Sequence, residues 1–379
     1  MSCETKNAAP YMIKVAIKTI EDYLRYVKIV ENLSRQKMLV QTICAMLKSR
    51  SVLLSELAHH LNDAVKTASN ETRLQDFFRE AEFDYDSMAH FLCHFMLSQN
   101  GGKIRLSIDR TEWDFGKQQT NILMVTANKG EWTVPLYWEM LDNNSGNSNS
   151  QDRIDLLEKC VQLLGVQRIG LLVGDREFIG HVWLKWLKDN KIPFCVRVPK
   201  SHLIETEDGT IYNAHHLWTN RPKPVEFKSC LIDGVWGCAK IATDAKGELL
   251  YLFGHGIEVK YLEQFYRKRW TIETLFQALK SRGFNLEATH LKHNDRLKKL
   301  VGVVAVAYAF CISLGILRHE KEKQIKIKKH KRKANSFFRY GLEFIRDAFK
   351  VGFKYEMQWL DTFTQFCKIF FKNNAFSTS

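Results

Sequence analysis

The sequence lacks any C-x2-C pair, although nine of its 379 residues are cysteines. The two cysteines that lie closest together, Cys230 and Cys238, fall in a stretch typical of β-strands. An odd number of scattered cysteines argues against a disulfide framework and against a zinc site. We therefore expect reduced, mostly buried thiols and a reducing compartment.

The first residues also lack the apolar core and the cleavage site of a signal peptide, because Glu4, Lys6 and Lys14 are spread through them. Disorder and fibrous structure are excluded by a composition that is 45% hydrophobic and 26% charged. The length allows two or three domains. We expect a globular protein.

Acidic residues are too few to balance the basic ones, so the formal net charge is +14. Such an excess favours a polyanionic partner, either nucleic acid or an anionic membrane surface. Residues 318–333 alone hold nine Lys or Arg against two Glu. This segment would fit a solvated surface, but we favour an interpretation in which it contacts phosphates.

Residues 300–317 form the one long run without a charge, flanked by Lys298, Lys299 and Arg318. The run is near the lower length limit for crossing a bilayer. Its Ala, Gly, Ser, Cys and Tyr residues insert weakly into membranes, and a buried core helix explains it as well. We expect no membrane partner, with a membrane anchor as the alternative.

Residues 1–100 are predicted to form a helical N-terminal DNA-binding domain, with apolar residues at helical spacing from Ile17 onward. Residues 54–61 form a short amphipathic pattern, and Ser69 or Asn70 is expected to cap a second helix. The pair suggests a helix-turn-helix motif whose second helix, with Arg73, faces a DNA groove. A plain helical bundle would have the same periodicity.

From residue 101 the period changes to that of strands. Strands are predicted at 103–109, 122–125, 132–137, 169–175 and 193–198, with helices at 153–164 and 178–190. Three strands, helix, strand, helix, strand is the order of a ribonuclease H-like α/β core, which defines the predicted fold class. Residues 101–198 form its first part, 199–256 a β-rich insertion, 257–318 further core helices and 319–379 a basic helical C-terminal region.

Two predicted strands end on an acid, Asp109 and Asp175. A lone Asp at a strand end is usually a turn residue, but neighbouring strands would bring both to one edge of a sheet. On a continuous helix, Tyr266, Arg269 and Glu273 would share one face with Lys280. Taken alone, that face would be an ordinary solvated one.

The spacing Tyr-x2-Arg-x3-Glu-x6-Lys, from Tyr266 to Lys280, resembles the signature of DDE transposases of the insertion sequence four family. Residues 109–113 and 175–180 look like the segments around the first and second acids of that family, and residues 336–342 look like its C-terminal stretch. Glu112 departs from the pattern, because relatives often carry Asn or Asp there.

The resemblance implies that Asp109, Asp175 and Glu273 are the catalytic metal ligands. Three carboxylates suit two Mg²⁺ (or Mn²⁺) ions about 4 Å apart. The resemblance also implies cut-and-paste transposition, in which the enzyme cleaves the ends of its insertion sequence and joins their 3′ ends to target DNA. The partners would be double-stranded DNA and a second copy in a synaptic homodimer, in the cytoplasm of a bacterium at the nucleoid.

Tyr266, Arg269 and Lys280 are expected to bind terminal DNA phosphates. Trp236 is our candidate for stacking a flipped base, in competition with Trp218, and Glu177 for supporting the metal ligands. The alternative function is a non-catalytic DNA-binding protein, or repressor, on the same fold.

Overall fold

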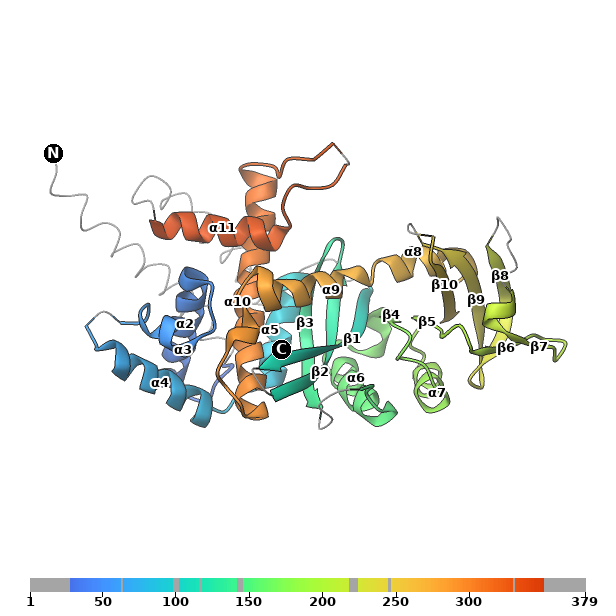
Figure 1. Ribbon diagram of the computed structural model, residues 1–379, viewed down its shortest axis with the longest axis horizontal. Helices are drawn as coiled ribbons and strands as arrows, with labels where there is room; N and C mark the ends of the chain where they lie inside the picture. The colour runs from blue at the N-terminus through green and yellow to red at the C-terminus, as the bar shows by residue number, and fades with distance from the viewer. Residues whose placement is uncertain are drawn as a thin grey trace, which may run out of the picture. The chain divides into compact units, whose positions relative to one another are not determined.

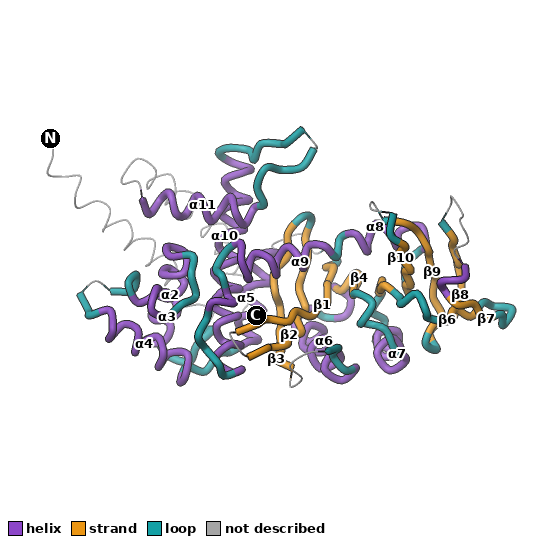
Figure 2. Tube along the Cα trace, in the orientation of Figure 1, coloured by secondary structure: helices purple, strands orange, loops and turns teal. Residues whose placement is uncertain are grey.

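The computed structural model describes residues 28–62, 64–97, 102–115, 118–141, 146–217, 224–244, 247–329 and 331–350 (Figures 1 and 2). The chain divides into two compact units. The helical unit comprises Met1–Ser98, Asp114–Gln118 and Phe276–Ser379, and the sheet unit comprises Gln99–Trp113 and Gln119–Leu275. The helix expected around Ile17 lies outside the described residues, as does Trp218. The predicted domain boundaries remain predictions.

The helical unit is built around one long apolar helix. Its elements are α2 (Leu33–Ser49), α3 (Leu54–Ala58), α4 (Thr67–Glu80), α5 (Tyr85–Leu97), the turns η4 (Ala278–Arg282) and η5 (Leu286–Ala288), α10 (Asn294–Lys321) and α11 (Phe337–Lys350). By length and hydropathy α10 could cross a membrane, but 89% of its apolar window is buried. It packs against α11, α2, α5 and α4, as the buried-helix interpretation predicted.

Helices α10 and α11 touch backbone to backbone at two glycines. A Cβ atom at Gly341 would lie 1.8 Å from the Cys311 carbonyl oxygen, and one at Gly315 would lie 2.0 Å from that of Phe337. No other residue type fits at either position without moving a helix. This contact explains why a glycine stands inside each helix.

The connection between α3 and α4 differs from the prediction. Neither Ser69 nor Asn70 caps α4, because the helix begins earlier, after Lys66. Asn70 is instead buried, and its Nδ2 donates to the carbonyl oxygens of Ala58 and Asn62 at 3.2 and 3.0 Å. Its amide therefore satisfies the α3–α4 turn. Arg73 lies on the exposed side of α4, so groove binding by that helix stays a prediction.

The basic segment that follows α10 forms a small exposed turn. Ile327 and Lys333 form an isolated antiparallel β-bridge, and the Lys328 backbone amide donates to the Arg332 carbonyl at 2.8 Å. Lys331 adopts a left-handed φ of 61° within it. The turn thus presents cationic side chains to solvent, which are those of Lys326, Lys328, Lys329, Lys331 and Arg332.

The sheet unit is mixed α/β. Its strands are β1 (Ile104–Phe115), β2 (Gln118–Lys129), β3 (Trp132–Leu141), β4 (Ile169–Gly174), β5 (Phe194–Arg197), β6 (Leu203–Glu205), β7 (Ile211–Asn213), β8 (Val225–Ile232), β9 (Val235–Thr243) and β10 (Leu249–His255). Its helices are α6 (Ser150–Leu164), η1 (Val166–Arg168), α7 (His181–Asp189), η2 (Ala214–Leu217), η3 (Val259–Tyr261), α8 (Leu262–Arg267) and α9 (Trp270–Gln277). The order from β1 to β5 is the predicted one.

The described strands form a single sheet in the order β3-β2-β1-β4-β5-β10-β9-β8-β6-β7. Strand β4 pairs in parallel with β1 and with β5, whereas β10 pairs antiparallel with β5. The strands of residues 199–256 therefore extend the sheet of the first five strands rather than forming a separate one. The central strands are nearly continuous apolar runs, as expected for strands buried on both faces.

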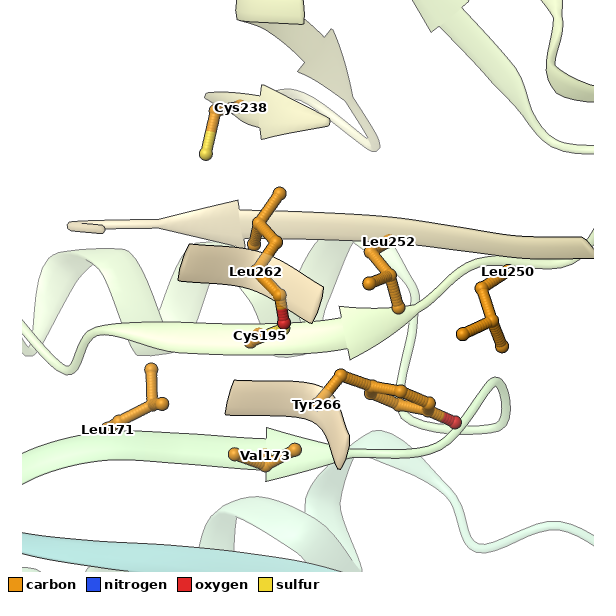
Figure 3. Packing of buried hydrophobic residues seen from close by; sticks show 8 residues of the cluster. All are labelled: Leu171, Val173, Cys195, Cys238, Leu250, Leu252, Leu262 and Tyr266. Atoms are coloured by element: carbon orange, nitrogen blue, oxygen red, sulfur yellow. The ribbon is translucent and has the colours of Figure 1, made fainter. Parts of the chain in front are cut away.

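Helix α8 covers one face of this sheet (Figure 3). Leu262 and Tyr266 of α8 pack against apolar side chains from β4, β5, β9 and β10, namely Leu171, Val173, Cys195, Cys238, Leu250 and Leu252. Burial raises the pKa of the Cys238 thiol to about 11. The cysteines of the described residues are free and buried, as the sequence predicted.

Candidate active site

Two carboxylates stand side by side at one edge of the sheet. The parallel pairing of β1 with β4 ends at Ile108 opposite Gly174, so Asp109 and Asp175 each follow the last paired residue. Each Oδ1 accepts a hydrogen bond from the next backbone N–H, at 2.8 Å from Arg110 and 2.7 Å from Arg176. The prediction that the first strand ends at the acid was wrong, because β1 keeps β2 as its neighbour and runs on to Phe115.

Tyr266 reaches this edge from α8. The predicted continuous helix was wrong: α8 ends at Arg267 and α9 begins at Trp270. Amide hydrogen bonds to the third residue back, such as Arg269 to Tyr266 at 2.9 Å, tighten the chain between the two helices. The Tyr266 ring is buried, and its hydroxyl donates to Asp175 Oδ1 at 3.0 Å.

Arg269 joins the remaining acids. Its Nη1 donates to Asp109 Oδ2 at 2.9 Å, and its Nη2 donates to Glu273 Oε1. The guanidinium also lies over the Tyr266 ring, 5.5 Å from the centroid. The carboxylates of Asp109 on β1 and Glu273 on α9 thus share the Arg269 guanidinium, whose planar fork of N–H donors suits two oxygens at once.

The cluster holds more acidic than basic side chains, so positive charge is in deficit. Burial raises the pKa of Asp109 to about 7, with Asp175 and Glu273 adding to the rise and Arg269 opposing it. Burial by itself would lower the pKa of Arg269, yet Tyr266 and the three carboxylates raise it above its ordinary value. One guanidinium therefore does not offset the cost of keeping three carboxylates charged, because desolvation disfavours the charged form of each.

The donor set fits a hard divalent ion, because its oxygens come from carboxylates that lack a full counter-charge. Within the described residues, however, no three His, Cys, Asp or Glu side chains group closely enough to hold an ion as they stand. Arg269 lies between Asp109 and Glu273 instead. Metal binding would require the guanidinium to leave at least one of these carboxylates.

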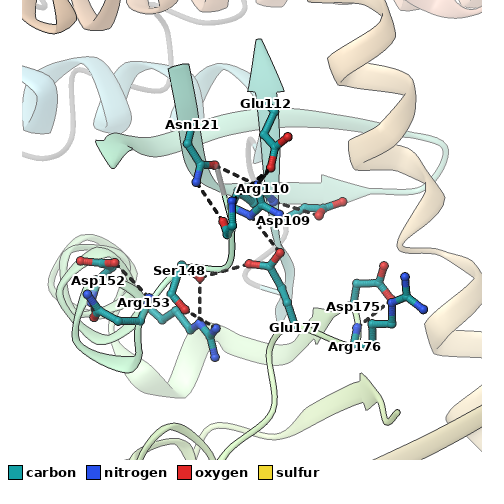
Figure 4. A network of polar contacts seen from close by, with 12 residues as sticks. Asp109, Arg110, Glu112, Asn121, Ser148, Asp152, Arg153, Asp175, Arg176 and Glu177 are labelled. Atoms are coloured by element: carbon teal, nitrogen blue, oxygen red, sulfur yellow. Dashed lines mark hydrogen bonds and ion pairs between the residues drawn. The ribbon is translucent and has the colours of Figure 1, made fainter. Parts of the chain in front are cut away.

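A second polar network supports the residue next to Asp109 (Figure 4). Arg110 Nε donates to Glu177 Oε2 at 3.0 Å, and its Nη1 donates to Asn121 Oδ1 at 3.1 Å. Glu177 also accepts from the Ser148 hydroxyl at 3.1 Å. Glu177 therefore ties the segment after β4 to the segment that carries Asp109. Glu112, the departure from the family pattern, accepts from Arg110 as well.

Two other predicted DNA-binding residues, Lys280 and Trp236, stand on other elements of the chain. Lys280 belongs to the helical unit, in the π-helical turn after α9, and pairs with Glu287 at 3.4 Å. Trp236 stands on β9 directly after the Asp233–Gly234 turn and is 42% exposed. An indole exposed to this degree is available for stacking. No contact of the described residues tests any of these DNA-binding roles.

Sequence reasoning missed two residues that organise the network. Arg153 is buried, and its Nε donates to the Ser148 hydroxyl at 2.8 Å. Asn121 is also buried, and its Nδ2 donates to the Gly146 carbonyl at 3.0 Å. A polar residue that opens the apolar run 121–125 was the available signal for Asn121, because buried amides need specific partners.

One of the comparisons with known proteins gave a family match. A sequence model of the family described as "Transposase DDE domain" matches residues 136–310, a range that contains Asp175 and Glu273 and begins after Asp109. The curated proteins gave no match. One solved structure, the cryo-EM structure of a piggyBac transposase synaptic complex with hairpin DNA, is similar at 10% identity, covering 98% of this chain and 82% of that chain. Its TM-score of 0.42 does not establish a shared fold. The match to the family supports a DDE transposase.

Proposed function

We propose that the protein is a cut-and-paste DNA transposase of the insertion sequence four type, built on a ribonuclease H-like core. The observation that carries the proposal is that three acids contact two neighbouring side chains, Arg269 and Tyr266. The acids are Asp109 of β1, Asp175 directly after β4, and Glu273 of α9. Residues far apart in sequence have no structural need to bring three acids to one sheet edge. Metal-dependent chemistry on phosphodiesters is a reason for doing so.

In this proposal the three carboxylates hold two Mg²⁺ or Mn²⁺ ions. When bound, such ions make a water or a 3′-hydroxyl nucleophilic and neutralise the leaving oxygen. Asp109 must lose the proton that its raised pKa of about 7 allows it to keep. Asp175 and Glu273 complete the ligand set from the neighbouring strand and from the helix.

Arg269 and Tyr266 have a second role in the proposal. Their contacts with the carboxylates hold the acids in place before DNA arrives. A terminal phosphate offers the guanidinium an alternative bidentate partner. Arg269 would then release Asp109 as it takes up the DNA end, so that end binding and formation of the metal site are coupled.

Double-stranded DNA is proposed to contact cationic side chains outside this cluster. The turn that contains Lys328 and Arg332, together with Lys280 and Arg73, would provide phosphate contacts. Trp236 would stack a flipped base. Pairing of two ends implies a homodimer during the reaction, in a bacterial cytoplasm at the nucleoid.

The decisive experiment measures Mg²⁺-dependent nicking of DNA that carries the element's terminal repeats. We expect Asp109→Ala, Asp175→Ala and Glu273→Ala each to abolish nicking. The matched control is Asp208→Ala, an acid in the exposed turn after β6, which should nick like the wild type. Retained nicking in the three site variants would contradict the proposal. A mobility shift with no nicking by the wild type would favour the non-catalytic repressor.

A second observation needs no protein. Cut-and-paste elements of this kind leave their coding region between short inverted repeats bounded by a direct duplication of target DNA. We expect both features in the DNA that flanks this coding region. Their absence would argue against a mobile element.

A further inference from the structure

A buried side-chain amide links the helix that carries Glu273 to the strand that carries Asp109. Asn128 lies on β2 with 5% of its surface exposed. Its Nδ2 donates to the Ser107 hydroxyl at 2.9 Å and to the Arg105 carbonyl at 3.1 Å. Ser107 is two residues before Asp109, and β1 holds both. One end of the link is therefore the strand of the first acid.

The other end of the link is the first turn of α9. The Thr271 hydroxyl lies 2.6 Å from Asn128 Oδ1 and 3.0 Å from the Lys268 carbonyl. A hydroxyl has one hydrogen, and the Asn128 oxygen is the nearer acceptor. Thr271 stands two residues before Glu273 and two after Arg269. Its anchoring therefore fixes the turn from which both side chains project.

The orientation of the Asn128 amide is determined by its surroundings. The Arg105 carbonyl can only accept a hydrogen bond, so the NH₂ group must face it and the oxygen must face Thr271. A buried amide is costly unless its groups are paired. Here both N–H groups and the oxygen have partners, so the amide favours one register of α9 on the sheet.

We propose that Asn128 and Thr271 are positioning residues for the metal site, which set the distance between Glu273 and Asp109. This inference rests on the proposed function, because it assumes that the two acids share a bound ion. Neither residue touches the reacting atoms. Their effect is to keep α9 docked at one height along β1 when Arg269 leaves the carboxylates.

The test replaces the hydroxyl without changing the shape of the side chain. Thr271→Val should weaken Mn²⁺ binding, measured by electron paramagnetic resonance on the full chain, by about 10-fold, as is typical when a group that orients a ligand is lost. It should raise the Mg²⁺ concentration for half-maximal nicking in parallel. Thr271→Ser, which restores the hydroxyl, should restore both values.

The matched control is Thr274→Val on the same helix. The Thr274 hydroxyl is exposed, and among the described residues it bonds within α9, to the Trp270 carbonyl at 3.2 Å. This variant should bind Mn²⁺ like the wild type. A general loss of helix stability would affect both variants alike and would overturn the inference, as would unchanged Mn²⁺ binding in a folded Thr271→Val.

Failure of the proposed function gives a different result. If the wild type and Asp109→Asn bind Mn²⁺ equally, the acids are not metal ligands, and the proposed function is overturned together with this inference. If Asp109→Asn loses binding and Thr271→Val does not, the inference alone is wrong. Urea unfolding of Asn128→Ala, Thr271→Val and the double variant should give changes in unfolding free energy that do not add. Such non-additivity would show that the two residues are coupled.

Discussion

Replacing Asp109 by Asn should stabilise the protein in the absence of metal, and more so at high pH. The pKa of Asp109 rises from its ordinary 3.8 to about 7 in the fold because the carboxyl is buried. Between these values the folded protein binds a proton that the unfolded chain has lost, so stability falls as pH rises through this window. Asn resembles the protonated carboxyl and does not titrate.

The size of the effect follows from the two pKa values. Their difference of about three pH units corresponds to a stability penalty on the order of 4 kcal/mol at pH 7.5. More than half of it, about 2.5 kcal/mol, should develop between pH 5 and pH 7.5. Only 15% of the side chain is exposed, so solvent screening leaves the direction of the effect unchanged.

The assay is urea unfolding of both proteins in the presence of a chelator, at pH 5 and pH 7.5. The free-energy difference between Asp109→Asn and the wild type should widen at the higher pH. Asp208→Asn is the control, because hydrogen bonds from Thr206 and Thr210 lower the pKa of that exposed carboxyl, so this variant should not gain stability. Parallel pH profiles for Asp109→Asn and the wild type would refute the reasoning.

Three further predictions concern charge and packing. Arg269→Ala should destabilise the metal-free protein by about 3 kcal/mol because it leaves buried carboxylates unpaired. Mg²⁺ should then raise the melting temperature of this variant more than that of the wild type. An equal rise in the two proteins would contradict the prediction. Gly341→Ala should destabilise the fold by about 3 kcal/mol through the clash with α10. The control Glu343→Ala, on the same helix, should change stability by about 0.5 kcal/mol or less. Thermal unfolding measures both variants, and equal melting temperatures would contradict the prediction. Lys328→Ala combined with Lys331→Ala should reduce the salt slope of DNA binding by about 2, measured by fluorescence anisotropy, and an unchanged slope would exclude phosphate contact by this turn.

The sequence predicted the part of the fold that depends on local pattern. The alternation of apolar and turn residues placed β1 to β5 and the two helices between them, and the strand-end positions of Asp109 and Asp175 indicated a shared edge. These features succeed because strand period and turn residues are local properties. Pairing partners are not local, so the antiparallel joining of β10 to β5 was not predicted.

The candidate site shows where pattern reasoning fails. An ideal helix from Tyr266 to Lys280 assumes 100° per residue, but the tight turn before α9 and the π-helical turn after it change that angle. Arg269 and Glu273 stay neighbours because they are only four positions apart in the sequence. Asn128 and Asn121 could not be predicted as partners, since their hydrogen bonds join segments that are distant in sequence.

Strand β5 is a short inner strand of the sheet, with four residues that hold β4 on one side and β10 on the other. In the sheet, β10, β9, β8, β6 and β7 are joined to the strands that carry the acids through the hydrogen bonds of β5, so loss of these bonds would open the sheet at β5. Cys195 lies in its middle, fully buried, with a thiol whose pKa is raised by burial. The rate at which Cys195 is alkylated therefore reports how often the sheet opens at β5, and it can be measured in the wild-type chain without an added label.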